Sequence, residues 1–169
     1  PLAGVVEIDE GFIVGKGSTK SVALVGGRIR FAQAPSNDQG SIKRFVDHEI
    51  DEQAIVISDG LASDNASALS GRLHAVMVQD KLEKQIKDSL QQCHWAISNL
   101  KRWLLGTHHG AVSSKHVQAY LDEFTFRYNR RKTHGVGRLA ARTLQFLVQH
   151  SPLTRRDVVE KTQACRLIA

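Results

Sequence analysis

The 169-residue chain has the composition of one soluble globular domain, with 41% hydrophobic and 24% charged residues. It has no run of 18 apolar residues, and its two cysteines form no disulfide framework. These features exclude a membrane span and a disulfide scaffold and favour a reducing compartment. The net charge of +6 is uneven: residues 1–80 hold 7 basic and 11 acidic side chains, and residues 81–169 hold 16 basic and 6 acidic ones. An acidic half joined to a basic half suits metal ions on one side and a polyanion on the other.

The chain begins with a pattern typical of an antiparallel meander. Val5 to Ile8 form a short strand-like run that ends at Asp9. Residues 21–25 and 28–32 flank Gly26-Gly27, a two-residue hairpin signal, because glycine accepts the positive φ that such turns need. We therefore expect three strands in succession, the first ending in a carboxylate.

A helix is expected after the meander. Ser36-Asn37-Asp38 provides its N-terminal cap, because short polar side chains accept hydrogen bonds from the first turn. The apolar positions Ile42, Phe45 and Val46 follow at helical spacing and should face inward.

A central strand with a second carboxylate comes next. Residues 54–57 form an unbroken apolar run, typical of a strand covered on both faces. The run is followed by Ser58-Asp59-Gly60, so we expect Asp59 at the C-terminal end of this strand. A small helix over 61–70 and a strand over 73–78 are also expected, whereas residues 79–92 could be either helix or a mobile connection.

Residues 93–132 carry the most informative pattern. They predict a helix, a Gly-Thr-His-His-Gly turn at 106–110 and a second helix. His94 and Lys101 are seven residues apart, so both side chains leave the first helix in nearly the same direction, two turns apart. Trp95 and Trp103 are interpreted as packing residues. The apolar stripe of the second helix consists of Val117, Tyr120, Leu121, Phe124 and Tyr128.

Positive charge gathers at the end of this second helix, where cations complement the helix dipole. The residues are Arg127, Arg130, Arg131 and Lys132. A third helix is predicted after Gly135 and Gly137, and its inward positions should be Leu139, Leu144, Leu147 and Val148. We expect residues 1–150 to form one domain and residues 151–169 a loosely attached tail.

Asp9, Asp59 and His94 are the residues that could carry chemistry together. Carboxylates at the ends of adjacent strands can share Mg²⁺, which prefers oxygen ligands and leaves room for substrate phosphate. Two such ions about 3.5–4 Å apart can assist phosphoryl transfer, and Lys101 could neutralise a neighbouring phosphate. Cys93, His108, His109 and His116 match no compact zinc-binding pattern, so no zinc site is expected.

Four motifs together resemble the ISXO-like DDE transposase domain of bacterial insertion sequences. They are Val-Glu-Ile-Asp-Glu at 6–10, Ile-Ser-Asp-Gly at 57–60, Gly-Thr-His-His-Gly at 106–110 and Tyr-Leu-Asp-Glu-Phe-Thr-Phe-Arg-Tyr-Asn-Arg-Arg at 120–131. The resemblance runs from about Val5 to Lys132. It implies a ribonuclease-H-like α/β fold, in which a mixed sheet of an antiparallel three-strand meander plus parallel strands has helices on both faces and a helical C-terminal part.

The resemblance also implies a function. The protein would cut and join double-stranded DNA at transposon ends with Mg²⁺, or with Mn²⁺, as a homo-oligomer on DNA in the bacterial cytoplasm at the nucleoid. Asp9 and Asp59 would be the first two metal ligands, and His94 falls where many relatives have Glu and others Asn or His. Lys101 falls on the lysine that follows. The expected DNA contacts are Lys101, Arg102, Arg127, Arg130, Arg131 and Lys132.

Two alternatives remain open at the level of sequence. One is a module that keeps the basic face and binds DNA without cutting it, and the other is an inert remnant of a degraded element. Such transposases usually begin with a zinc-ribbon or helix-turn-helix segment. The chain instead starts at Pro1 on an apolar strand, which is consistent with a piece of a longer protein.

Overall fold

The computed structural model describes residues 1–13, 19–25, 27–33, 39–58, 69–76, 91–109, 112–149, 151–152 and 154–156. The chain forms two compact units, Pro1–Val112 and Ser113–Ala169. In the part of the chain so described, no helix has the length and apolar character needed to cross a membrane. The predicted cap at 36–38, Asp59, most of the predicted helix over 61–70 and the tail beyond residue 156 lie outside the described residues.

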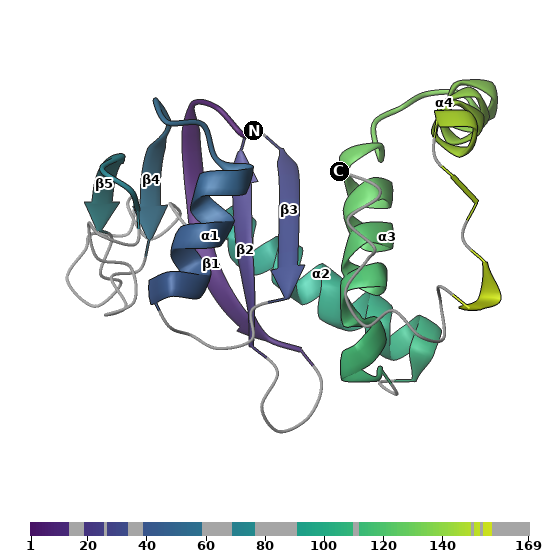
Figure 1. The fold of residues 1–169 in the computed structure, drawn as a ribbon, viewed down its shortest axis with the longest axis horizontal. Coiled ribbons are helices and arrows are strands. Elements are labelled where there is room, and N and C mark those ends of the chain that lie inside the picture. Colours follow the sequence, from purple (N-terminus) through teal and green to yellow (C-terminus); the bar gives the residue numbers. More distant parts are fainter. Residues whose placement is uncertain are drawn as a thin grey trace. The chain divides into compact units, whose positions relative to one another are not determined.

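The first unit contains a five-stranded mixed sheet in the order β3-β2-β1-β4-β5 (Figure 1). β1 pairs antiparallel with β2 and parallel with β4, β2 pairs antiparallel with β3, and β4 pairs parallel with β5. The strands are β1 (Val5–Phe12), β2 (Thr19–Val25), β3 (Arg28–Gln33), β4 (Ile55–Ser58) and β5 (Leu73–Val76). The predicted hairpin joins β2 to β3, and Gly27 adopts a φ of +88° there.

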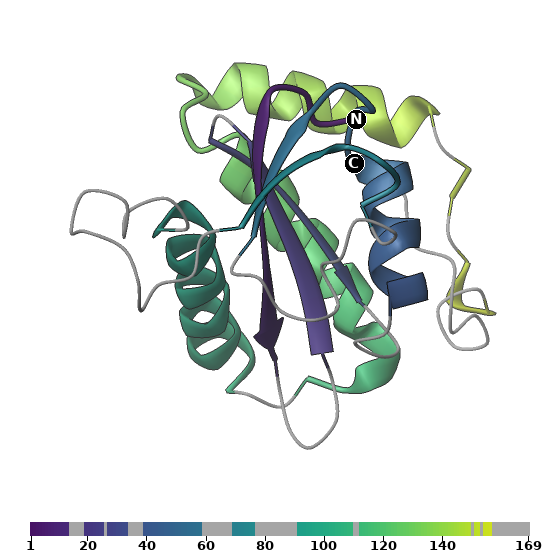
Figure 2. The same ribbon diagram turned by 90° about the vertical axis from the view of Figure 1, so that its left-hand side faces the viewer.

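Helices cover both faces of this sheet, which confirms the predicted mixed α/β class (Figure 2). On one face, α1 (Gln39–Glu49) buries its predicted apolar positions in a core with alternate residues of β1 and with β4. The core residues from these elements are Val6, Ile8, Ile42, Phe45, Val46 and Val56. On the other face, α2 (Gln91–His108) packs against β1 and β2. Because neighbouring strand residues point to opposite faces, Glu7, Asp9 and Gly11 face α2.

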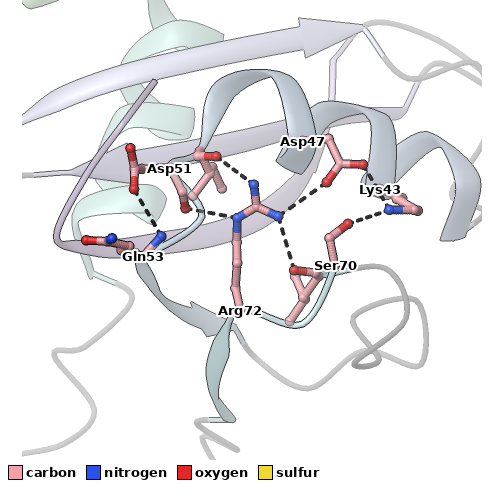
Figure 3. Close-up of polar contacts among 8 residues, drawn as sticks. Lys43, Asp47, Asp51, Gln53, Ser70 and Arg72 are labelled. Atoms are coloured by element: carbon pink, nitrogen blue, oxygen red, sulfur yellow. Dashed lines mark hydrogen bonds and ion pairs between the residues drawn. The ribbon is translucent and has the colours of Figure 1, made fainter.

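Arg72 ties the start of β5 to the end of α1 (Figure 3). Its side chain is buried, and it donates hydrogen bonds to the carbonyl oxygens of Ile50 (2.8 Å) and Asp51 (3.0 Å) and to the Asp47 carboxylate (3.2 Å). Carbonyls at a helix C-terminus have no partner inside the helix. The buried guanidinium therefore satisfies the Ile50 carbonyl and adds a second hydrogen bond to the Asp51 carbonyl, which also accepts from the Ala54 N–H at 3.2 Å. No local sequence pattern marks Arg72 for this role.

Two strand predictions need correction. Asp9 lies inside β1 rather than at its end, because pairing with β2 continues as far as Phe12 opposite Thr19. The run at 54–57 is not covered on both faces: Val56 is fully buried but Ile55 is 40% exposed. Burial therefore alternates along β4, as in a strand with one packed face.

The predicted turn at 106–110 is also wrong in part. α2 continues through Gly106 and Thr107 to His108, and the chain turns only at His109, whose φ is +51°. Glycine inside a helix costs only about 1 kcal/mol relative to alanine. A residue in the left-handed region is a common helix ending, so the helix stops one turn later than the glycine suggests.

The second unit contains a 3₁₀ turn (Ser114–His116), α3 (Val117–Asn129) and α4 (Val136–Gln149). The predicted stripe of α3 is buried at Val117, Leu121 and Phe124. The basic residues 130–132 follow the end of α3 rather than forming its last turn.

The third predicted helix exists as α4, but its expected inward face is wrong. Leu144 is 60%, Leu147 67% and Val148 86% exposed. Phe146 instead meets Phe126 of α3, with ring centroids 6.2 Å apart. Phe146 thus faces α3, while the leucine stripe is exposed.

Candidate active site

The N-terminus of α2 is anchored on β1 by Glu7. The backbone N–H of Cys93 donates to Glu7 Oε2 at 3.1 Å, and Cys93 Sγ donates to the Glu7 carbonyl oxygen at 3.4 Å. Cys93 is the third residue of α2, so its N–H has no acceptor within the helix. A carboxylate at this point also complements the positive end of the helix dipole. Glu7 therefore fixes where the first turn of α2 lies on the sheet.

Asp9 of β1 and His94 of α2 form the next contact between these two elements. Asp9 Oδ2 lies 3.2 Å from His94 Nε2, and Asp9 Oδ1 accepts a hydrogen bond from the Glu10 N–H at 2.8 Å. The Asp9 side chain is 10% exposed and the His94 side chain is 47% exposed. The structure thus brings together two of the three predicted metal ligands, with imidazole on the solvent side. The third, Asp59, lies outside the described residues.

Gly11 provides the third contact between β1 and α2. A β-carbon added at Gly11 would lie 3.0 Å from Ile97 Cγ2, closer than side chains normally approach. Ile97 itself is 7% exposed. The absence of a side chain at residue 11 therefore lets α2 lie close enough to β1 for Asp9 to reach His94.

Glu7 and Cys93, which lie beside the Asp9–His94 pair, both have raised pKa values. Burial raises the pKa of Glu7 above its usual value, although the Cys93 hydrogen bonds and His94 oppose this shift. Burial also raises the pKa of the Cys93 thiol strongly, and the negative charges of Glu7 and Asp9 add to it. Since only the thiolate is a nucleophile or metal ligand, Cys93 is a packing residue.

Among the residues that the structure describes, no group of three or more His, Cys, Asp and Glu side chains could hold a metal ion. His108 instead packs edge-on against Trp103, with ring centroids 5.2 Å apart.

The predicted DNA-contacting residues fall in both units. Lys101 and Arg102 are exposed on α2. In the second unit, Arg127 pairs with Glu123 at 2.7 Å, and the Arg130 guanidinium lies 3.8 Å from the centre of the Phe126 ring. Arg131 lies 3.9 Å from the centre of the Tyr128 ring, and Lys132 is exposed. Of the four predicted DNA-contacting cations in the second unit, three thus have structural contacts that charge counting does not reveal.

The fold has a counterpart among solved structures. The catalytic core domain of BIV integrase aligns with a TM-score of 0.54 at 14% sequence identity, covering 84% of this chain and 97% of that domain. At this identity the likeness concerns the fold alone, and it fits a ribonuclease-H-like arrangement.

The sequence carries the family assignment. Residues 19–129 match the ISXO2-like transposase domain, which is more than half of the chain, so the chain belongs to the ISXO2-like transposase domain family. This confirms the predicted family. No curated protein matches the chain significantly. The matched region contains His94 and Lys101 but begins after Asp9 and ends before Arg130, so it is narrower than the predicted resemblance.

Proposed function

We propose that this chain is the catalytic domain of a DNA transposase that cuts and joins insertion-sequence ends by metal-dependent phosphoryl transfer. The observation that carries the proposal is the contact between Asp9 and His94, 3.2 Å apart, in a chain of a transposase domain family. We propose Asp9, Asp59 and His94 as the catalytic metal ligands. Lys101 acts beside them as a phosphate contact.

The separation of the described pair supports a shared divalent ion. Two ligands at right angles, each about 2.1 Å from an ion, lie about 3.0 Å apart. The observed 3.2 Å between Asp9 Oδ2 and His94 Nε2 is close to that value. Glu7 pairs with Ile57 across the parallel strands, and Asp59 follows Ile57 by two residues, as Asp9 follows Glu7. This equal spacing supports Asp59 as the further ligand.

Other residues of the chain position the metal ligands and the phosphate. When bound, the ion supplies charge stabilisation at the phosphate and lowers the pKa of an attacking water or hydroxyl. Asp9 is oriented by the Glu10 N–H, and His94 is held by the first turn of α2, which Glu7 anchors. Lys101, two turns along the same helix face, neutralises a neighbouring phosphate.

The proposed partner is double-stranded DNA. Arg102 and the basic residues 127, 130, 131 and 132 contribute phosphate contacts, which fits the excess of positive charge after residue 80. The protein binds double-stranded transposon ends as a homo-oligomer in the bacterial cytoplasm. Mg²⁺ is the expected ion, and Mn²⁺ suits the imidazole ligand.

The test is metal-dependent cleavage of an oligonucleotide that carries the terminal repeat of the element. Asp9→Asn and Asp59→Asn should each abolish cleavage in Mg²⁺ and Mn²⁺ while leaving DNA binding within about twofold, because positive charge dominates affinity. His48→Ala, which changes an exposed histidine of α1, is the matched control and should cleave normally. Full cleavage by Asp9→Asn would refute the proposed site.

A second candidate function is that of a module that binds DNA without cutting it, and the histidine among the proposed ligands favours it. One of the three proposed ligands is His94, and an imidazole gives the ion one negative charge less than a carboxylate would. DNA binding by the parent chain with no cleavage in either metal would establish this alternative.

A further inference from the structure

One exposed face of α2 carries an aromatic and an apolar side chain that have no role in the candidate active site. Trp95 is 57% exposed and Leu105 65% exposed, and Lys101 and Arg102 lie between them in sequence and are also exposed. The packing interpretation of Trp95 is therefore wrong. Trp103 behaves differently, since it is half-buried and packs edge-on against His108. Trp95 leaves most of a large aromatic surface in water, where an aromatic side chain contributes little to folding.

The positions along the helix place this tryptophan beside the proposed chemistry. Trp95 follows His94 directly, and Arg102 follows Trp95 by seven residues, as Lys101 follows His94. Seven helical steps return to nearly the same direction and rise about 10.5 Å. The face therefore consists of two neighbouring rows, His94 with Lys101 and Trp95 with Arg102.

The charge of this face restricts its partner. The sequence of α2, from Gln91 to His108, contains Lys101 and Arg102 and no aspartate or glutamate. A second copy of the same helix would be repelled, whereas a polyanion is attracted. An exposed aromatic ring beside cations is the arrangement by which proteins bind single-stranded nucleic acid, with the ring stacked on a base and the cations on phosphates.

We propose that Trp95 stacks on an unpaired DNA base next to the phosphate at the Asp9–His94 pair, while Lys101 and Arg102 hold the adjoining phosphates. The inference rests on the proposed function, because it places the DNA end by the candidate active site. It adds to that function a preference for ends whose terminal bases are unpaired. Stacking depends on a π-surface and not on base identity, so the preference is tolerant of sequence.

The test uses tryptophan fluorescence, since Trp95 and Trp103 are the only two tryptophans. In Trp103→Phe, Trp95 is the sole reporter. Its emission should be quenched by a duplex with three unpaired terminal bases and much less by the fully paired duplex of the same sequence. Both titrations are made without divalent metal, so that binding is separated from cleavage.

Affinity variants complete the test. Trp95→Ala should weaken binding to the unpaired end by about 5- to 100-fold and binding to the paired duplex by less than twofold. Trp95→Phe should retain most of the preference because it keeps an aromatic ring. Leu73→Ala, which removes an exposed apolar side chain from β5, is the control and should change neither affinity.

The outcomes separate this inference from the proposed function. Equal losses on both DNAs, or emission that DNA does not change, would overturn stacking. Metal-dependent cleavage by the parent chain would then leave the transposase proposal standing. Failure of the parent chain to bind either DNA would overturn both.

Discussion

Glu7→Ala should destabilise the first unit by releasing the N-terminus of α2. The substitution removes the acceptor of the Cys93 N–H, now 3.1 Å from Glu7 Oε2. Loss of a capping side chain costs about 0.5–2 kcal/mol, and a hydrogen bond to a charged group contributes about 1.5–3 kcal/mol. Because removing a partly buried carboxylate also recovers desolvation free energy, we expect a net loss of about 1–2 kcal/mol. Glu7→Gln should lose less than half of this, since its amide oxygen can still accept.

The assay is urea-induced unfolding of the parent and both variants, with Glu52→Ala as the control because Glu52 is exposed in a loop. The control should change the free energy of unfolding by less than about 0.5 kcal/mol. Hydrogen exchange should also show faster exchange of the Cys93 amide in Glu7→Ala. Equal stability of Glu7→Ala and the control, or an unchanged exchange rate, would refute the role assigned to Glu7.

Three further changes test other parts of the structure. Gly11→Ala should reduce cleavage, because its β-carbon would lie 3.0 Å from Ile97 Cγ2 and Ile97 of α2 would have to move away from β1; unchanged kinetics would contradict this contact. Arg72→Met should cost about 1–3 kcal/mol in urea unfolding, because it removes the hydrogen bonds of the guanidinium to the Ile50 carbonyl and to the Asp47 carboxylate; a cost below about 1 kcal/mol would argue against the role of Arg72. Asp47 tests the same cluster by pH, since hydrogen bonds from Ser70, Lys43 and Arg72 lower its pKa to about 2 from 3.8. Its stabilising contribution is present above pH 3.8 and lost as the pH falls towards 2, so the parent and Asp47→Asn should differ in stability at pH 6 and converge near pH 2. A difference that persists at pH 2 would contradict this assignment.

Local signals in the sequence predicted a large part of the fold. The hairpin between β2 and β3 depends on the backbone freedom of glycine, as at Gly27, and the burial of Ile42, Phe45 and Val46 depends on helical periodicity. Both properties are local, and both were correct. The prediction that His94 and Lys101 lie two turns apart on one helix was also correct, since both residues lie within α2.

Features decided by tertiary contacts were not predictable in the same way. The position of Asp9 inside β1 depends on how far β2 continues to pair with it. Whether the leucine stripe of α4 is buried depends on what packs against it, and periodicity alone does not supply that. The roles of Glu7 and Arg72 require knowledge of which backbone groups lie beside them, and no spacing rule supplies that.

The central claim is that His94 shares a divalent ion with Asp9, and the metal preference of DNA joining tests it most directly. Joining of terminal-repeat DNA is measured in Mg²⁺ and in Mn²⁺ for the parent chain, His94→Glu and His94→Ala. Imidazole is a softer ligand than carboxylate and suits Mn²⁺ better than Mg²⁺. The parent should therefore join DNA faster in Mn²⁺, His94→Glu should narrow the difference between the two metals, and His94→Ala should lose most activity in both. Joining by His94→Ala at the parent's rate, with the parent's metal preference, would contradict the claim.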